Sequence, residues 1–273
     1  MLLDGVLYYR WRWPRLGGLK LHVILKRELG EEITHGRDSF LKFLSSEGLT
    51  LPKVKRRRTT DSSHPYRKYP NLIVGLEPQS VNQVWVSDIT YVWIAGDVLY
   101  LHLVSDMYSH AIIGWALSET MESRHTTDAL EMAIQTANGG NLCGTIHHSD
   151  RGAQYAGYQY VGTLMEHHIR ISMTERYNPT DNALAERQNG ILKIENIYLR
   201  EMYRNYEEAK TEIGKAIEFF NRERPHMSLG MKKPMDVYTG KEEPGRNLWK
   251  KKQQESCTDK EETLSLECRK QGE

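Results

Sequence analysis

The sequence has few cysteines and no long apolar run. Its three cysteines, Cys143, Cys257 and Cys268, are scattered and form no Cys-x-x-Cys pair. This excludes a disulfide framework and a cysteine-based zinc site, and it suits a reducing compartment. No stretch approaches the roughly 18 apolar residues that a membrane helix needs. The first ten residues include Asp4 and lack a small-residue cleavage site, so they are not a signal peptide, and we expect a cytoplasmic protein without membrane contact.

The chain also lacks an excess of either charge, because 37 Lys and Arg balance 36 Asp and Glu to a net charge of +1. That balance hides an asymmetry along the sequence. Residues 1–80 carry 15 basic and 8 acidic side chains, whereas residues 81–240 carry 14 and 20. A basic N-terminal part suits a polyanion. The acidic middle part should repel a polyanion unless cations intervene.

Two short helices are predicted in the first 50 residues. Leu19, Val23 and Ile24 recur at helical spacing before Gly30, and a second apolar face lies within residues 36–48. A basic run follows at Lys53, Lys55, Arg56, Arg57 and Arg58. This run is either a solvated linker or a contact to the DNA backbone, where basic side chains release condensed counterions.

From residue 81 the pattern changes to alternating strands and helices. Residues 83–94, 97–109 and 110–119 read as three antiparallel strands with short connections. We then expect a helix at 123–138, a strand at 144–150, a helix at 157–168, a strand at 169–175, and helices at 180–199 and 206–223. Thr180 or Asp181 is a natural N-cap for the helix at 180–199. This order indicates an α/β core, and the residues from 241 onward form a polar tail.

Three carboxylates stand out within this core. Asp88 lies in the middle of an apolar strand, where a carboxylate is costly unless it is paired. Asp150 follows a short strand, and Glu186 lies in the first turns of a helix. Each also has an ordinary explanation: a strand charge that faces water, a turn residue before Gly152, and a favourable helix-dipole position.

Order, spacing and flanking residues distinguish between these explanations. Asp150 and Glu186 are separated by 35 residues, and Lys193 follows Glu186 by two helical turns. This pattern resembles the retroviral-integrase and transposase superfamily. The residues that carry the resemblance are WVSDITY, HSDRGAQY, P-T-D-N-A-x-x-E and the C-terminal RPHMSLGMKKPMDVY. It is most similar to the second-reading-frame transposases of the IS-three family, over residues 15–240. The segment LGGLKLHVILKREL resembles the helix-turn-helix-like region of that family.

The resemblance implies an RNase H-like core with a mixed five-stranded sheet, flanked by helices and preceded by a small helical segment. It implies that Asp88, Asp150 and Glu186 are catalytic and hold two Mg²⁺ or Mn²⁺ ions, with Asp88 shared between them, and that Lys193 contacts DNA. Such ions prefer oxygen ligands, and a pair of them compensates charge during phosphodiester cleavage. Zinc is not expected, because the His-His-Cys-Cys spacing of retroviral integrases is absent.

The expected division is a DNA-binding segment at 1–50, a basic linker at 51–79, a catalytic core at 80–240 and a polar tail at 241–273. The N-terminal part before Arg15 is shorter than in relatives, so we expect a shortened product or one made as a fusion with an upstream-frame DNA-binding protein. The expected function is a transposase that cuts element ends, joins them to target DNA and works as a homo-oligomer on DNA. Two alternatives remain: a non-catalytic DNA-binding remnant or regulator, and an RNase H-like nuclease.

Overall fold

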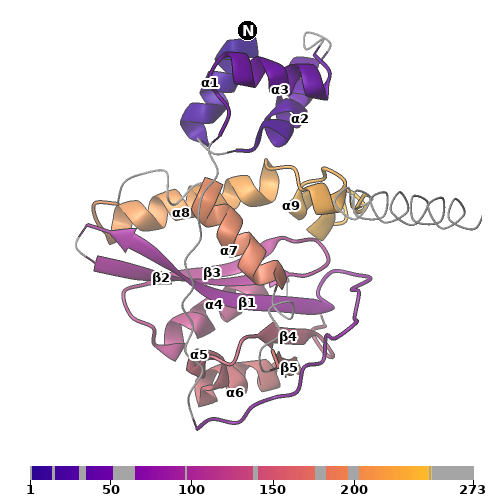
Figure 1. The fold of residues 1–273 in the computed structure, drawn as a ribbon. Coiled ribbons are helices and arrows are strands. Elements are labelled where there is room, and N and C mark those ends of the chain that lie inside the picture. The colour runs from indigo at the N-terminus through magenta and orange to yellow at the C-terminus, as the bar shows by residue number, and fades with distance from the viewer. Residues whose placement is uncertain are drawn as a thin grey trace, which may run out of the picture.

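A mixed five-stranded sheet forms the centre of the protein, in the order β3-β2-β1-β4-β5 (Figure 1). The computed structural model describes residues 2–13, 16–30, 35–51, 65–95, 97–137, 141–175, 183–195, 203–245 and 247. Its strands are β1 (Val84–Ile94), β2 (Asp97–Asp106), β3 (Ile112–Ser118), β4 (Ile146–Ser149) and β5 (Arg170–Met173). Strands β1, β2 and β3 pair antiparallel, whereas β4 pairs parallel with both β1 and β5.

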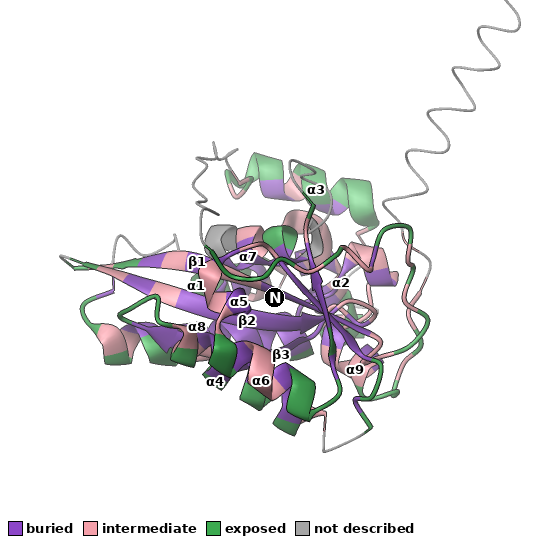
Figure 2. Ribbon diagram, turned by 90° about the horizontal axis from the view of Figure 1, so that it is seen from below, coloured by how far each residue is buried: buried purple, intermediate pink, exposed green. Residues whose placement is uncertain are grey.

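Helices cover both faces of this sheet. The helices of the described residues are α1 (Leu2–Arg12), α2 (Gly18–Leu29), α3 (Arg37–Ser46), α4 (Ser123–Thr136), α5 (Ala153–Ala156), α6 (Tyr158–Glu166), α7 (Ala183–Glu195), α8 (Tyr206–Arg222) and α9 (Pro234–Tyr238), with a 3-10 turn at Met227–Leu229. Helices α7 and α8 lie on one face, and α4, α5 and α6 lie on the other (Figure 1). The strands are mostly buried between these layers, while the outward turns of α4 and α6 are exposed (Figure 2).

Apolar side chains of β2 point alternately to the two faces of the sheet and pack in the core on both. Leu101 and Leu103 pack with the α8 residues Ile213 and Ile217, whereas Val104 packs with α4 and α6 on the opposite face. Successive strand side chains point to opposite faces, so one strand contributes to two separate clusters.

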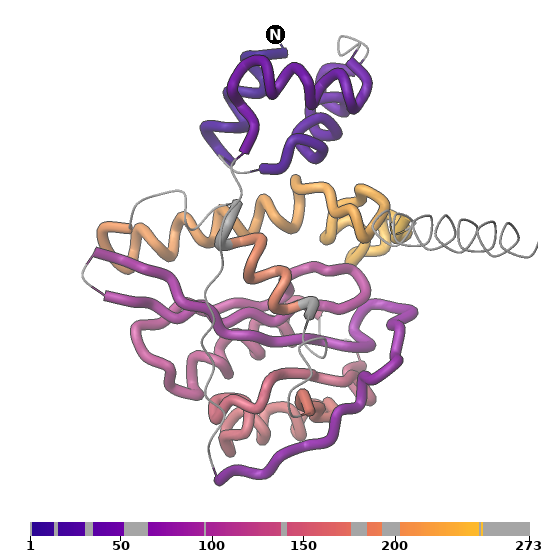
Figure 3. The backbone as a smooth tube through the Cα atoms, viewed as in Figure 1, coloured from indigo at the N-terminus to yellow at the C-terminus, as the bar shows by residue number. Residues whose placement is uncertain are grey.

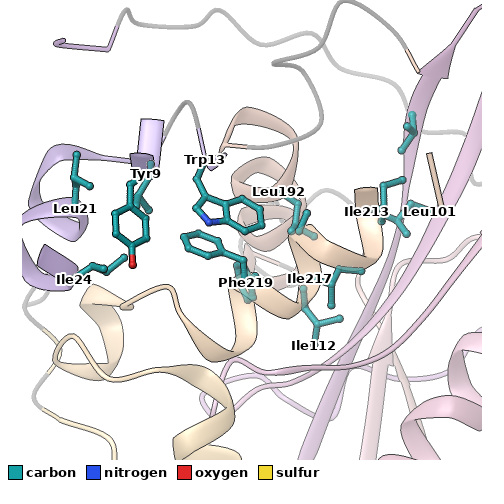
Figure 4. Close-up of a cluster of buried hydrophobic side chains, with 14 of the residues drawn as sticks. Tyr9, Trp13, Leu21, Ile24, Leu101, Ile112, Leu192, Ile213, Ile217 and Phe219 are labelled. Atoms are coloured by element: carbon teal, nitrogen blue, oxygen red, sulfur yellow. The ribbon is translucent and has the colours of Figure 1, made fainter. Parts of the chain in front are cut away.

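The three N-terminal helices pack on the side of α8 that faces away from the sheet (Figure 3). Trp13 stacks on Phe219 of α8 with ring centroids 3.8 Å apart and an interplanar angle of 19°. Figure 4 shows this pair between Tyr9 of α1 and the sheet-facing residues of α8. Arg12 also forms an ion pair with Glu223 at 3.2 Å. The apolar core is therefore continuous from the N-terminal helices to the sheet.

The segment at 65–79 runs along the β5 edge of the sheet (Figure 3). The backbone N–H of Leu72 donates to Ser172 Oγ at 2.8 Å, and Ile73 is buried beside β1. This part of the predicted linker thus packs against the core.

The mixed five-stranded sheet with helices on both faces confirms the predicted fold class, and every predicted strand and helix of the core is present. Four elements were missed, among them α9 and the 3-10 turn at Met227–Leu229. Helix α1 was not predicted, although its buried residues Val6 and Tyr9 have helical spacing with Trp13, and α5 is a separate short helix before α6. The predicted N-cap of α7, at Thr180 or Asp181, lies outside the described residues. No helix in the described part of the chain is long and apolar enough to cross a membrane.

Candidate active site

Parallel pairing of β1 with β4 places Asp88 beside Asp150. Trp85 pairs with His147, and Val86 pairs with His148. Asp88 and Asp150 each lie two residues beyond this last pair, so they occupy matching heights on neighbouring strands. Adjacent strands are about 4.8 Å apart. Two carboxylates that are distant in sequence therefore meet at the carboxyl end of β4.

Helix α7 brings the third carboxylate to the same face of the sheet. Ala185 is buried in a cluster with Val84 and Val86 of β1 and Ile146 of β4. Glu186 is the next residue, in the first turn of α7, and its side chain is exposed. The apolar contact of Ala185 thus fixes the position of the Glu186 backbone over the sheet.

The charge environment of Asp88 includes both of the other carboxylates. Burial is the largest effect, and with the negative charge of Asp150 it raises the pKa of Asp88 to about 7. The charge of Glu186 acts in the same direction, whereas hydrogen bonds from Asn189 and the Ile89 N–H oppose it. A carboxyl group with this pKa is about half protonated at neutral pH. Asp150 and Glu186 therefore lie near enough to Asp88 for their charges to act on it.

Hydrogen bonds hold two of the carboxylates in place. Asn189 Nδ2 donates to Asp88 Oδ2 at 2.6 Å, and the Ile89 N–H donates to Asp88 Oδ1 at 2.9 Å. The N–H of Gly152 donates to Asp150 Oδ1 at 2.8 Å. A Cβ at Gly152 would lie only 2.9 Å from that same oxygen, so a larger residue at this position would displace the Asp150 carboxylate.

Asn189 is a site residue that the sequence analysis missed. It follows Glu186 by three positions, which places both on one face of α7, and this spacing was the available signal. Its neighbour Gln188 is also buried and donates from Nε2 to the carbonyl of His110 at 3.0 Å. This bond ties α7 to the turn between β2 and β3.

The donor chemistry of the site fits a hard divalent cation. Three carboxylates supply oxygen ligands and the negative charge that Mg²⁺ or Mn²⁺ requires. As the side chains stand, no three His, Cys, Asp or Glu among the described residues form a ready-made metal cluster. Like charges repel at close range, which favours separated side chains until a cation is present. The side chain of Glu186 on α7 is exposed to solvent.

The two histidines before Asp150 belong to the core. His147 Nε2 lies 2.7 Å from both Ser87 Oγ and Tyr160 Oη, and burial lowers the pKa of His147 to about 3. His148 Nδ1 lies 2.8 Å from Ser172 Oγ. His147 and His148 are successive strand residues that point to opposite faces, which agrees with their different partners.

Buried polar residues outside this site have structural contacts. Asp106 is fully buried and accepts hydrogen bonds from the Asn82 N–H and from the N–H and hydroxyl of Ser109, which fixes the turn after β2. Arg224 and His226 of the C-terminal motif are buried, with Arg224 Nη1 and His226 Nε2 3.0 Å apart. These contacts favour packing over a DNA contact for this pair.

The predicted DNA-contacting side chains cannot be placed in the same way. Lys193 lies in α7 two turns beyond Glu186, but its side chain lies outside the described part of the structure. Lys53, Lys55, Arg56, Arg57 and Arg58 also lie outside the described residues. Their roles stay predictions.

Comparison with known proteins identifies the family. Residues 78–179 and 167–234 each match a family described as "Integrase core domain". The chain is 38% identical over 210 residues to an insertion element IS600 protein of 31 kDa from Shigella sonnei, covering 76% of each chain. It is 31% identical over 226 residues to a protein assigned as a transposase of insertion sequence element IS986/IS6110 from Mycobacterium tuberculosis, covering 81% of this chain and 80% of that one.

A solved structure shares the fold. A chain of the simian T-cell lymphotropic virus intasome, determined by cryo-EM, is 18% identical with a TM-score of 0.51, covering 86% of this chain and 74% of the other. The fold and the matched domains define a protein with an integrase-type core. The chain belongs to the insertion-sequence transposases that carry this core, and its function is that of a DNA transposase.

Proposed function

We propose that this transposase cuts the ends of its insertion sequence and joins them to target DNA at one metal-dependent site formed by Asp88, Asp150 and Glu186. The observation that supports the proposal most strongly is the parallel register of β1 and β4, which sets Asp88 beside Asp150, with Glu186 following the buried Ala185 on α7 over the same strands. Both steps are in-line attacks on a phosphodiester, first by water and then by a DNA 3′-hydroxyl. One site can therefore serve both.

Asp88, Asp150 and Glu186 would hold Mg²⁺ or Mn²⁺, and we expect two ions. When bound, such ions compensate charge on the phosphoryl oxygens and lower the pKa of water. The protein contributes alignment. Asn189 holds Asp88 through Oδ2 and favours its ionised form, while the Gly152 N–H fixes one oxygen of Asp150. Glu186 reaches the pair from a helix that is anchored independently through Ala185 and Gln188.

Binding of DNA is assigned to two regions. Lys193 extends the α7 face that begins at Glu186 and would contact phosphate near the scissile bond. The helices within 1–50 and the basic run of the linker at 51–79 would contact the DNA backbone, leaving 80–240 for catalysis. The net positive charge of residues 1–80 supports this division. We expect a homo-oligomer on DNA, an upstream-frame protein as a further source of DNA recognition, and action in the bacterial cytoplasm at the nucleoid.

A nuclease assay tests the proposal. Duplex oligonucleotides that carry the element ends are incubated with the full chain in Mg²⁺ or in EDTA, beside an unrelated duplex and an RNA–DNA hybrid. We expect cleavage only at element ends and only with Mg²⁺. Cleavage of the hybrid alone would favour the RNase H-like nuclease, and DNA binding without any cleavage would favour the non-catalytic regulator.

A further inference from the structure

A buried tyrosine beside the carboxylates has a hydroxyl group with no function in the account so far. Tyr155 lies in α5 and is 2% exposed. Within the described part of the chain, its hydroxyl has no hydrogen-bond partner. A buried hydroxyl without a partner is costly, and most buried polar groups avoid it. This group therefore calls for an explanation.

The ring of Tyr155 and the carboxylate of Asp150 lie on the same side of one glycine. A Cβ built on Gly152 would lie 3.5 Å from Cδ2 of Tyr155 and 2.9 Å from Oδ1 of Asp150. The ring of Tyr160 packs edge-on against Tyr155, with centroids 5.6 Å apart. The Tyr155 ring is thus fixed beside the carboxylate site.

The same site keeps this hydroxyl protonated. Burial raises the pKa of Tyr155 well above its ordinary value, and the negative charges of Asp150 and Asp88 raise it further. A protonated phenol can donate a hydrogen bond, and a carboxylate is the strongest acceptor nearby.

We propose that Tyr155 is a positioning residue of the carboxylate site, whose hydroxyl donates a hydrogen bond to Asp150 when a divalent cation is bound. The inference rests on the proposed metal-dependent function. Groups that orient metal ligands by hydrogen bonds are worth about 10–100-fold in metal affinity. The donor stays unpaired in the metal-free protein and gains its partner when the cation fixes the carboxylate.

Tyr160 provides a matched control. It is also a fully buried tyrosine, one helix further along the chain, but its hydroxyl lies 2.7 Å from His147 Nε2. Tyr160→Phe removes a satisfied hydrogen bond in the core, whereas Tyr155→Phe removes an unsatisfied hydroxyl. The two substitutions should therefore have opposite signatures.

The test measures Mn²⁺ binding to the full chain by electron paramagnetic resonance of the free ion, together with the melting temperature in EDTA. We expect Tyr155→Phe to weaken Mn²⁺ binding about 10-fold or more while its metal-free melting temperature equals or exceeds that of wild type. Tyr160→Phe should melt lower and bind Mn²⁺ within about twofold of wild type.

Two results would overturn the inference, and they are distinguishable. If wild type binds Mn²⁺ and Tyr155→Phe binds it equally well, Tyr155 is only a core residue and the proposed function stands. If wild type binds no more Mn²⁺ than the Asp88→Asn, Asp150→Asn double variant, the proposed metal site itself is wrong and the role of Tyr155 falls with it.

Discussion

Removing the charge of Asp88 should stabilise the metal-free protein, and only above acidic pH. The pKa of Asp88 is raised from 3.8 to about 7 in the folded chain. Between these values the folded state binds more protons than the unfolded state, so the stability contributed by protonated Asp88 is lost as pH rises. At about 1.4 kcal/mol per pKa unit, the full shift corresponds to about 4 kcal/mol above pH 7. The Asp88 side chain is largely buried but keeps some contact with solvent, which screens its charge, so we expect about 1–2 kcal/mol.

Asp88→Asn keeps the side-chain volume and cannot ionise. In EDTA at pH 8, urea denaturation should show this variant about 1–2 kcal/mol more stable than wild type, and the gain should vanish near pH 4. Asp97→Asn is the matched control, because Asp97 is an exposed carboxylate at the far end of the β1–β2 pair. The control should show no such pH-dependent gain. An equal gain at both pH values, or none at pH 8, would refute the electrostatic reasoning.

Three further predictions follow from other parts of the chain. Replacing Lys55–Arg58 by alanine should weaken binding to all DNA sequences alike. The slope of log affinity against log salt concentration should become shallower by up to about 3–4 units. A loss of affinity for one sequence alone would mean that the segment reads bases. Asn189→Ala removes a bond that lowers the pKa of Asp88, so an NMR titration of the Asp88 carboxyl group in EDTA should give a higher pKa than in wild type. An unchanged pKa would contradict this role. Trp13→Ala should lower the free energy of unfolding, measured by urea denaturation, by about 3–5 kcal/mol. Trp11 is 82% exposed, so Trp11→Ala should change it by less than about 0.5 kcal/mol. Equal effects would show that the Trp13–Phe219 stack does not hold the N-terminal helices.

The sequence was sufficient for the strands and for the candidate carboxylates because both have local signals. Apolar and polar residues alternate at 83–94 and predict β1. The motifs around Asp88, Asp150 and Glu186 are each short, continuous stretches of sequence. The meeting of Asp88 with Asp150 depends on one further fact, the parallel register of β1 and β4, which no local pattern reports.

The residues that support the site were harder to find. Asn189 bonds to Asp88, which is distant in sequence, and the role proposed for Tyr155 depends on Asp150 in the adjacent turn. Both residue types are common in helices for other reasons. Helix α1 was missed because its exposed face carries Leu7 and Trp11, so apolar residues lie around the helix and blur the amphipathic pattern. These features come from tertiary packing.

The central claim is that one carboxylate site performs both cleavage and joining, and the most direct measurement assays the two steps separately. Asp88→Asn, Asp150→Asn and Glu186→Gln are tested on intact element ends for cleavage and on pre-cut ends for strand transfer, with DNA binding measured in parallel. We expect each substitution to abolish both steps and to leave DNA binding within a few-fold of wild type, because an amide oxygen is a poorer ligand for a hard cation. A folded variant that cuts or joins DNA at the wild-type rate would remove that residue from the site.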